Sequence, residues 1–332
     1  MQKKNPAKRR PERLAVILLS LLFISTAVFA TVKYVFRAPE LDTDKPVVTP
    51  DGTASTDVDR TDTDEPDAPG RTRREYCYNI LVSGLDDDNG GSDTNILMAV
   101  DTVNGYVYGV SIPRDSKAII GGKAHKINYA YNKGGTELLA STVSEQLGIP
   151  VDYTVCVNLQ GFTALVDAIG GVDFEVPINM DYDDPIQGLS IHFKKGMQHL
   201  SGADALRVVR FRHNNDGTGY GSEDLGRMQT QQKFLKAVAK KMLSFENLIS
   251  NPRKYAEIFG QYVDTDLSVT DLAWFGMQVL GMGVDKIDFS TLPNEWKSPY
   301  IYLDPDETLA LVNTYLNPYV EDRTAEDLNL PG

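Results

Sequence analysis

Charged side chains gather where one predicted β-hairpin ends. Asn104-Gly105 stands between two apolar runs, and Asn-Gly in that setting is the strongest short-range signal for a hairpin. If the turn closes directly around this pair, the register continues outward until Asn95 lies opposite Arg114, with Asp93 within a residue or two. We therefore expect one end of the sheet to carry carboxylates beside Arg114 and Asp115.

Three further carboxylates lead into the same sheet end. Asp86, Asp87 and Asp88 lie in the connection between the preceding predicted strand and the hairpin. Clustered carboxylates repel one another, and Mg²⁺ relieves this repulsion because it binds one or two carboxylates while it keeps waters and a substrate phosphate. An Asp-rich turn that caps backbone amides is the alternative interpretation. The hairpin by itself leaves both interpretations open.

Arginines form a second charged group far along the chain. Arg210 and Arg212 fall within residues 206–213, a stretch that is ambiguous between helix and strand, and on an extended path they share one face. Arg227 and Gln231 follow at i, i+4 spacing on a clearly amphipathic predicted helix. The guanidinium fork suits a phosphate group better than the point charge of a lysine does. Salt bridging at the surface is the alternative for each arginine.

Composition and motifs exclude several classes of function. The 332 residues carry 33 Lys or Arg against 46 Asp or Glu, a net charge of −13, which argues against a sequence-independent nucleic-acid binder with a basic face. Residues 214–221, a lid or a plain loop, contain three glycines but no Gly-Lys-Ser/Thr follows, so they are not a Walker phosphate loop. The four histidines lack metal-ligand spacing, and the sequence has no Gly-x-Ser-x-Gly nucleophile elbow.

The N-terminal residues predict a membrane anchor. Residues 1–13 hold six Lys or Arg, and residues 14–32 then run without a charge, which is roughly the length of helix that crosses the hydrocarbon core. We expect a transmembrane signal-anchor helix over 14–36, with the basic tail in the cytoplasm and the rest outside, because positive flanks stay inside. A cleaved signal peptide with a small-residue cleavage site at 28–30 is the alternative, although the apolar core of such peptides is usually shorter.

An acidic tether is expected next. Residues 38–67 carry ten Asp or Glu against two Lys or Arg and almost no large apolar side chain. Such a segment cannot bury enough surface to offset its ordering entropy, so residues 37–75 are predicted to be a disordered linker. The linker would hold the following domain off the bilayer but close to lipid-borne material.

Strand and helix patterns alternate in the rest of the chain. This alternation predicts a layered α/β/α domain around a mixed central sheet, with a catalytic domain over 76–245 and a C-terminal extension over 246–332 that packs on it. We expect Cys77 and Cys156, on or beside strands, to be unpaired, with a disulfide as the alternative. The predicted strands are 78–83, 95–101, 106–112, 151–159, 172–178 and 286–292, and the predicted helices are 136–147, 162–169, 223–243, 271–280 and 307–316.

Short blocks of sequence carry a resemblance to a known family. In order, and over about residues 76–245, they resemble the blocks of the LytR–CpsA–Psr family. The layout of anchor, linker and external domain is similar to that family as well. The blocks are Ser92-Asp93-Thr94-Asn95-Ile96-Leu97, Ser111-Ile112-Pro113-Arg114-Asp115, Lys126-Ile127-Asn128-Tyr129-Ala130-Tyr131, Gly161-Phe162 to Gly170-Gly171-Val172, Asp181-Tyr182-Asp183-Asp184-Pro185, residues 195–202, Val209-Arg210-Phe211-Arg212-His213 and Gly226-Arg227.

The resemblance implies a transferase that moves an anionic glycopolymer, such as wall teichoic acid or capsular polysaccharide, from a polyprenyl-pyrophosphate carrier in the membrane to peptidoglycan. It implies Mg²⁺ as cofactor, with Asp86 and Asp93 as ligands, and an apolar tunnel for the lipid under the sheet. We hypothesise that Asp93, or another nearby carboxylate, also takes the proton of the attacking hydroxyl. By motif position, the residues that grip the pyrophosphate are Arg114, Arg210, Arg212 and Arg227, with Gln231, Lys126 and Asp115 in weaker or supporting roles.

The sequence departs from the family pattern at two points. Members often carry an arginine in the loop before the Ser-Asp-Thr block, and residues 86–91 contain none. The helix block usually continues Gly-Arg-x-x-Arg-Gln, and Thr230 stands at the second arginine. The absence of two positive groups could weaken the grip on pyrophosphate or change the preferred polymer.

Other functions stay open. A polyprenyl-pyrophosphate hydrolase, in which water replaces peptidoglycan, would need the same side chains. The protein could instead be a non-enzymatic module of the cell envelope with a carrier-lipid-binding or regulatory role. This alternative predicts lipid binding without Mg²⁺-dependent turnover. A DNA-binding regulator is disfavoured by the predicted anchor and the acidic external domain.

Overall fold

The computed structural model describes residues 37–41, 72–85, 91–186, 188–221, 223–242, 244 and 252–332. The predicted membrane helix, most of the predicted linker and Asp86 fall outside these residues. Within the described ranges, no helix is long and apolar enough to cross a membrane. The anchor over 14–36 therefore stays a prediction.

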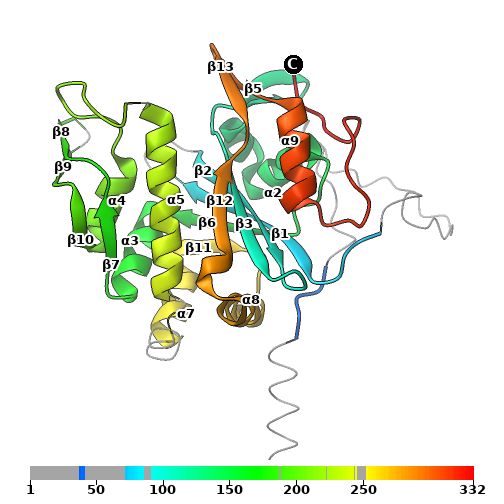
Figure 1. Cartoon of the computed structure of the whole chain (residues 1–332), viewed down its shortest axis with the longest axis horizontal. Coiled ribbons are helices and arrows are strands. Elements are labelled where there is room, and N and C mark those ends of the chain that lie inside the picture. The colour runs from blue at the N-terminus through cyan, green and yellow to red at the C-terminus, as the bar shows by residue number, and fades with distance from the viewer. Residues whose placement is uncertain are drawn as a thin grey trace, which may run out of the picture.

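A six-stranded mixed sheet forms the centre of the structure (Figure 1). Three of its strands that follow one another in the sequence form an antiparallel meander. One further strand pairs in parallel with each side of this meander. Both edge strands come from residues 252–332, so the C-terminal segment completes the central sheet. From edge to edge, the strands are β11 (Val263–Thr265), β6 (Tyr153–Asn158), β1 (Cys77–Leu85), β2 (Ser92–Asp101), β3 (Tyr106–Ile112) and β12 (Ile287–Thr291).

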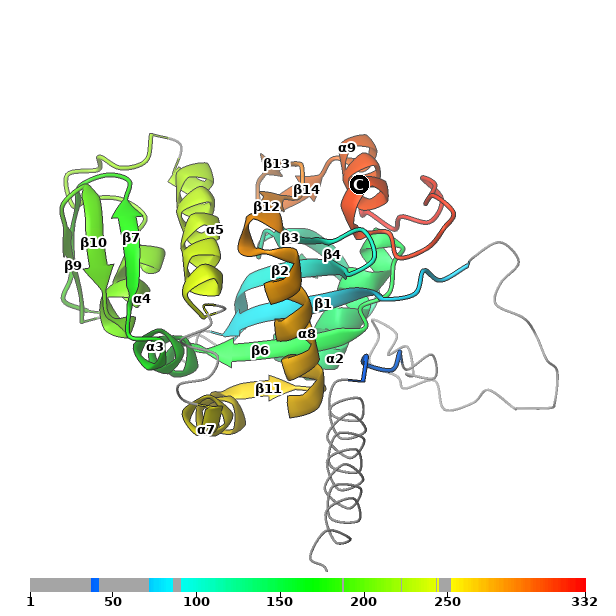
Figure 2. The same ribbon diagram turned by 60° about the horizontal axis from the view of Figure 1, so that its bottom comes forward.

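Helices cover both faces of this sheet, which confirms the layered arrangement (Figure 2). On one face, Leu138 and Leu139 are buried against Leu81 and Leu97 of the sheet. On the other face, Trp274 lies in an aromatic cluster with strand residues. Removal of this apolar surface from water is the main term that holds the layers together. The helices are α2 (Asn128–Leu147), α9 (Pro305–Leu311) and η3 (Val312–Leu316) on the first face and α8 (Val269–Met282) with η2 (Val284–Lys286) on the second.

A second hydrophobic core lies beside the sheet. Its centre is Phe234, which is fully buried, with ring centroids 5.8 Å from Phe162 and 5.3 Å from Phe174. This core connects α5 to α3, α4 and two small sheets. The elements are α3 (Leu159–Ala168), β7 (Val172–Val176), β8 (Met180–Asp184), β9 (Leu189–Phe193), β10 (Gly196–Leu200), α4 (Gly202–Arg210), α5 (Glu223–Met242) and α7 (Pro252–Tyr262).

Two short hairpins lie at the end of the sheet where β3 finishes. Neither hairpin is predicted by the sequence, because strands of four residues that are exposed or half-buried leave too little periodicity to detect. Their strands are β4 (Lys117–Ile120) with β5 (Lys123–Lys126) and β13 (Asn294–Lys297) with β14 (Tyr300–Leu303).

The predicted strands and helices are otherwise present, with shifted ends. The largest shift is in α2, which begins at Asn128 and not at 136. Gly134 and Gly135 interrupt it with non-helical backbone angles, and Gly135 has a φ of 66° that favours glycine. The apolar periodicity is visible only after this kink, so the first two turns escaped prediction.

Both ends of the predicted linker lie against the domain. Ala38 and Leu41 pack on the aromatic cluster under α8, and the hydroxyl of Tyr78 donates to the carbonyl of Pro39 at 3.1 Å. At the other end, Arg73 forms a 2.6 Å ion pair with Asp152. Residues 38, 39, 41 and 73 of the predicted linker thus contact the domain, and the boundaries of 37–75 stay a prediction.

The register of the β2–β3 hairpin differs from the prediction. Asn95 pairs with Ile112 and not with Arg114. The turn holds four residues because the carboxylate of Asp101 accepts hydrogen bonds from the backbone N–H groups of Val103 and Asn104, at 3.1 and 2.8 Å. Arg114 consequently lies beyond the last paired residue, where its side chain is free to turn toward its neighbours.

Residues 202–210 form a helix, so the extended path considered for Arg210 and Arg212 is wrong for most of this stretch. Ser201 caps α4, since its side chain accepts from the backbone N–H of Asp204 at 3.2 Å. Extended backbone begins only at Phe211, which is buried. The two arginines therefore flank the exit of the chain from α4.

Cys77 and Cys156 are both buried, free thiols. They lie on the neighbouring strands β1 and β6. Burial raises the pKa of Cys77 to about 11. The expectation that they are unpaired is confirmed, and such thiols act as small apolar side chains.

Phe234→Ala tests the second core. We expect the free energy of unfolding to fall by about 3–5 kcal/mol, since a fully buried ring is lost and a cavity stays behind. Urea unfolding followed by circular dichroism measures the change. Met277→Ala, at a half-exposed position on α8, is the control and should stay within about 0.5 kcal/mol of the parent protein.

His192 on β9 provides a test of pH dependence. Its Nδ1 lies 2.7 Å from Oδ1 of Asp181, and this hydrogen bond raises the pKa of His192. Because the pKa is raised in the folded state, the protonated imidazole stabilises the β8–β9 hairpin at any pH below the pKa of the unfolded state. This stabilisation is lost as the pH rises through the pKa of the folded state. In an NMR titration, Asp181→Asn should lower the pKa of His192. Asp173→Asn, beside His199, should leave it unchanged.

Candidate functional site

Charged side chains meet at the end of the sheet where β3 finishes. Nη1 of Arg114 lies 2.5 Å from Oδ1 of Asp93, at the start of β2. The two side chains are 39% and 37% exposed, so a ligand can reach both. The structure therefore joins these two residues although the register was predicted wrongly. Paired residue numbers in β2 and β3 sum to 207, so the observed register, continued past Ile112, places Arg114 opposite Asp93.

Asp115 and Lys126 extend the same cluster. Oδ1 of Asp115 lies 3.6 Å from Nε of Arg114 and 3.0 Å from Nζ of Lys126. The backbone holds the two segments together, since the N–H of Asn128 donates to the carbonyl of Arg114 at 3.3 Å. Charge thus alternates through Asp93, Arg114, Asp115 and Lys126, and we call these four residues the strand-end cluster.

The second group of predicted residues lies where α4 ends and α5 begins. The side-chain amide of Gln231 donates to the carbonyl of Val209 at 3.0 Å, which fixes α5 to the residue before Arg210. Within the described part of the chain, neither Arg210 nor Arg212 has an ion-pair or side-chain hydrogen-bond partner. Arg210 is half-buried and Arg212 is exposed.

Arg227 lies one turn before Gln231 on α5, next to Tyr220. Burial raises the pKa of Tyr220, and the charge of Arg227 opposes the rise. The ring of Tyr220 packs closely against the backbone of α5 at Gly226. Glycine is required there, because a Cβ at Gly226 would lie 2.2 Å from the Cβ of Tyr220. Gln231 thus positions the backbone here, and Arg227 supplies charge.

Hydrogen bonds from Gln232 connect the two groups. Its Nε2 donates to the carbonyl of Ser290 at 2.9 Å, to Oγ1 of Thr291 at 3.1 Å and to Oγ of Ser111 at 3.5 Å. Further along α5, Nζ of Lys236 lies 2.8 Å from Oδ1 of Asp288. The helix therefore runs antiparallel to β12, and its first turns lie at the carboxyl ends of β12 and β3 (Figure 1).

This orientation brings the predicted arginines toward one end of the sheet. Arg227 lies roughly 7.5 Å before Gln232 along the helix axis, on the side where β3 leads into Arg114. The Thr230 that replaces the second arginine of the family pattern is buried and donates to the carbonyl of Gly226 at 2.8 Å. It supplies no positive charge to this end of the sheet.

The residues expected to bind metal are only partly described. Asp86 lies outside the described residues, and in the described ranges no group of three or more His, Cys, Asp or Glu is arranged to hold a metal ion. Asp93 and Asp115 do offer carboxylate oxygens at one place. An all-oxygen donor set with room for waters is what Mg²⁺ prefers.

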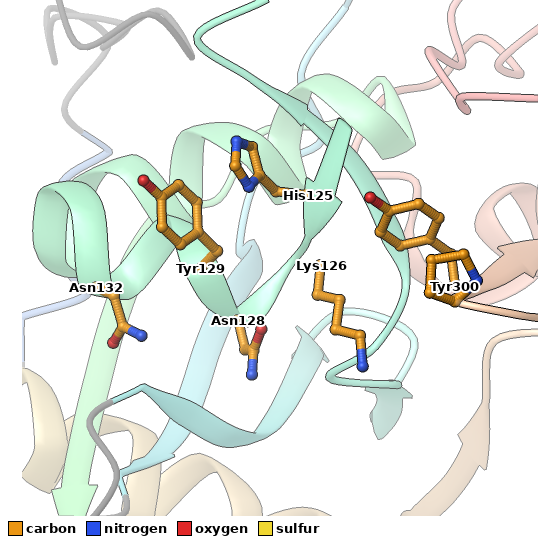
Figure 3. A pocket seen from close by; sticks show the side chains of 7 residues that line it. His125, Lys126, Asn128, Tyr129, Asn132 and Tyr300 are labelled. Atoms are coloured by element: carbon orange, nitrogen blue, oxygen red, sulfur yellow. The ribbon is translucent and has the colours of Figure 1, made fainter. Parts of the chain in front are cut away.

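A cavity of about 350 Å³ adjoins the strand-end cluster (Figure 3). Of the lining residues, only Lys126 was predicted from the sequence as a site residue. Those on α2 lie in one of the family-like blocks, which was a usable signal, whereas nothing in the sequence pointed to the C-terminal hairpin. The lining residues are His125, Lys126, Asn128, Tyr129, Asn132, Pro299 and Tyr300.

Comparison with known proteins decides the family. The family model LytR_cpsA_psr matches residues 48–316. The chain belongs to the LytR–CpsA–Psr family. The resemblance of its sequence blocks to that family is thereby confirmed.

Characterised relatives carry two kinds of name. The chain is 32% identical over 241 residues to the polyisoprenyl-teichoic acid–peptidoglycan teichoic acid transferase TagV of Bacillus subtilis. This alignment covers 70% of this chain and 59% of TagV. The chain is 40% identical over 176 residues to the transferase TagU of Bacillus mycoides, covering 52% and 54%. The chain thus spans less than two thirds of these relatives. It is also 31% identical over 263 residues to the regulatory protein MsrR of Staphylococcus aureus, covering 78% and 77%.

The fold of this LytR–CpsA–Psr protein agrees with a solved structure. The crystal structure of B. subtilis TagV superposes with a TM-score of 0.60 at 29% identity. The match covers 73% of this chain and 96% of TagV. The central sheet and its helices are therefore those of the family.

Gln232→Ala tests the connection between α5 and the sheet. We expect the free energy of unfolding to fall by about 1–2 kcal/mol, because the partly buried carbonyl of Ser290 loses its donor. Thermal unfolding by calorimetry measures the loss. Gln229→Ala, at an exposed position of the same helix, is the matched control and should leave stability unchanged.

Proposed function

We propose that this protein is a membrane-anchored, extracytoplasmic phosphotransferase. It moves an anionic glycopolymer, of teichoic acid or capsular polysaccharide type, from a polyprenyl-pyrophosphate carrier to peptidoglycan. Family membership and the named activities of TagV and TagU support the reaction. The observation that carries the proposal is that, among the residues that the structure describes, Arg210 and Arg212 have no carboxylate partner.

The charge of the protein makes this observation informative. With a net charge of −13, carboxylates are abundant, and Arg207 on the same helix pairs with Asp204 at 2.9 Å. Arg210, one turn later and half-buried, has no such partner among the described residues. A diphosphate would satisfy guanidinium groups through paired, charge-assisted hydrogen bonds. These arginines therefore support an anionic ligand.

The proposed reaction is a displacement at phosphorus. A hydroxyl oxygen of the acceptor glycan forms a bond to the phosphorus that carries the polymer, and the bond from this phosphorus to the bridging oxygen breaks. The polyprenyl phosphate leaves with the bridging oxygen and its electron pair. Arg114, Arg210, Arg212 and Arg227 stabilise the charge that develops, which is the main requirement of phosphoryl transfer. Asp93, or another nearby carboxylate, takes the proton of the hydroxyl.

Mg²⁺ is the cofactor in this proposal. Asp93 would hold it together with Asp86, and Asp115 lies at the same sheet end. When bound, the ion neutralises charge on the diphosphate oxygens. Asp93 is 37% exposed, so a hydrated ion can reach its carboxylate.

A regulatory role is the second candidate, because MsrR is named a regulatory protein. It predicts binding of carrier lipid without turnover. A hydrolase is the third candidate and predicts release of polymer to water. One assay separates the three, since it can report linked polymer, free polymer or neither.

Arg210→Ala tests the proposal. The full-length protein in detergent is given a synthetic polyprenyl-pyrophosphate glycan and a peptidoglycan oligomer, with and without Mg²⁺, and the products are separated by chromatography. We expect linked polymer from the parent protein with Mg²⁺, and a rate lower by about 100-fold or more in the variant, the usual effect of losing one charge-stabilising donor.

Arg207→Ala is the matched control, because Arg207 lies on the same helix but already has a partner. It should retain nearly the full rate. If Arg210→Ala and Arg207→Ala behave alike, the proposed role of Arg210 is wrong. If the parent protein binds the donor but forms no product, the regulatory candidate holds instead.

A further inference from the structure

The cavity beside the strand-end cluster has walls from three secondary-structure elements, which lie on two separate segments of the chain. β5 supplies Lys126, α2 supplies Asn128 and Asn132, and the β13–β14 hairpin supplies Tyr300 (Figure 3). A volume of about 350 Å³ is at the lower end of the range for small-molecule sites, roughly 300–1,000 Å³. The cavity is open to solvent and has room for one sugar ring.

Hydrogen bonds hold the hairpin wall next to the charged cluster. The backbone N–H of Ile301 donates to the carbonyl of Asp115 at 2.9 Å. The hydroxyl of Tyr300 donates to the carbonyl of Ala124 at 3.1 Å. Since Asp115 directly follows Arg114, a ligand in the cavity lies beside the site proposed for the diphosphate.

Aromatic rings line and flank the cavity. His125 and Tyr129 stack with centroids 4.1 Å apart and planes inclined by 15°. Tyr129 is 39% exposed, and Trp296 of the β13–β14 hairpin is 56% exposed. Nζ of Lys126 lies 6.0 Å from the ring centroid of Trp296. Large aromatic side chains left accessible beside a cavity favour a ligand with flat apolar faces.

The polar groups of the cavity are mainly uncharged. Asn128 and Asn132 bring side-chain amides, each with donor and acceptor atoms, and Tyr300 brings a hydroxyl. Asn132 also reaches the start of β2, since a Cβ at Gly91 would lie 3.2 Å from its Oδ1. Lys126 is the lining residue with a permanent charge, and Asp115 already neutralises it. This lining suits a polyhydroxylated, uncharged ring better than a phosphate.

We propose that this cavity is a saccharide subsite that binds one sugar ring next to the reacting phosphate. The proposal rests on the proposed transferase function, because it assigns the ring to one of the two glycans of that reaction. The ring stacks on the accessible aromatic faces, and its hydroxyl or acetamido groups bond to Asn128 and Asn132. Its source is either the acceptor glycan or the first sugar of the donor.

Fluorescence titration of the full-length protein tests binding directly. Trp274 is buried under the other face of the sheet, so Trp274→Phe leaves Trp296 beside the cavity as the reporter. We expect a saturable change in Trp296 emission when a peptide-free tetrasaccharide of peptidoglycan is added, or, for a donor subsite, when the polyprenyl-pyrophosphate glycan is added. No change with either probe would overturn the proposal.

Kinetics of Tyr129→Ala and Trp296→Ala identify the source of the ring. Loss of one stacking face should raise KM by about 3- to 10-fold with a smaller change in kcat. A rise in the KM of the acceptor assigns the subsite to the acceptor, and a rise in the KM of the donor assigns it to the donor. Unchanged KM values for both substrates would contradict the proposal.

Tyr315→Ala is the matched control. Tyr315 is 36% exposed and stacks on Tyr108 with centroids 3.7 Å apart, far from the cavity along β3. It should change neither KM value, and calorimetry checks that all variants fold. If the parent protein transfers nothing, the proposed function fails, whereas the fluorescence titration still decides whether the cavity binds a sugar.

Discussion

The hydrogen bonds of Gln232 are the interaction on which the arrangement of this protein depends. They fix α5 across the carboxyl ends of β3 and β12, two parallel strands that are far apart in sequence. Arg210, Arg212 and Arg227 lie on or beside helices that pack in the second hydrophobic core, and Arg114 lies just past the end of β3. Only the position of α5 brings the two sets toward one end of the molecule. The proposed diphosphate site thus depends on the contacts between α5 and β12, which are those of Gln232 and the ion pair of Lys236 with Asp288.

Some positive side chains at this end of the sheet have carboxylate partners among the described residues, and others do not. Arg114 and Lys126 are compensated by Asp93 and Asp115, so the strand-end cluster is stable without a ligand. The arginines of the α4 exit are not compensated by any described residue. Their charge is tolerated because Arg212 is exposed and Arg210 is only half-buried, where solvent screens it. An anion that replaces this solvent gains more from them than from arginines already paired.

The sequence predicted the layers and all strands of the central sheet except β11, because buried β-branched runs and one long amphipathic helix leave clear periodicities. It also brought Asp93 and Arg114 together, although through a wrong register. The error arose because Asp101 caps the turn with its side chain, an interaction that a two-residue Asn-Gly turn does not require. The edge strand β11 and the hairpin over the cavity depend on contacts with distant residues. Short strands of this kind carry no local pattern that reveals their partners.

The C-terminal segment shows why a family-like block is not by itself a site. Lys126 and Tyr129 lie in such a block, but the cavity beside them has a far wall only because Ile301 and Tyr300 bond to Asp115 and Ala124. Residues near 300 are thereby coupled to the same backbone that positions Arg114. A change in this hairpin would alter the shape of the cavity while it leaves the arginines in place. Recognition of a neutral ring and neutralisation of charge are therefore separable properties, located on different segments of one sheet end.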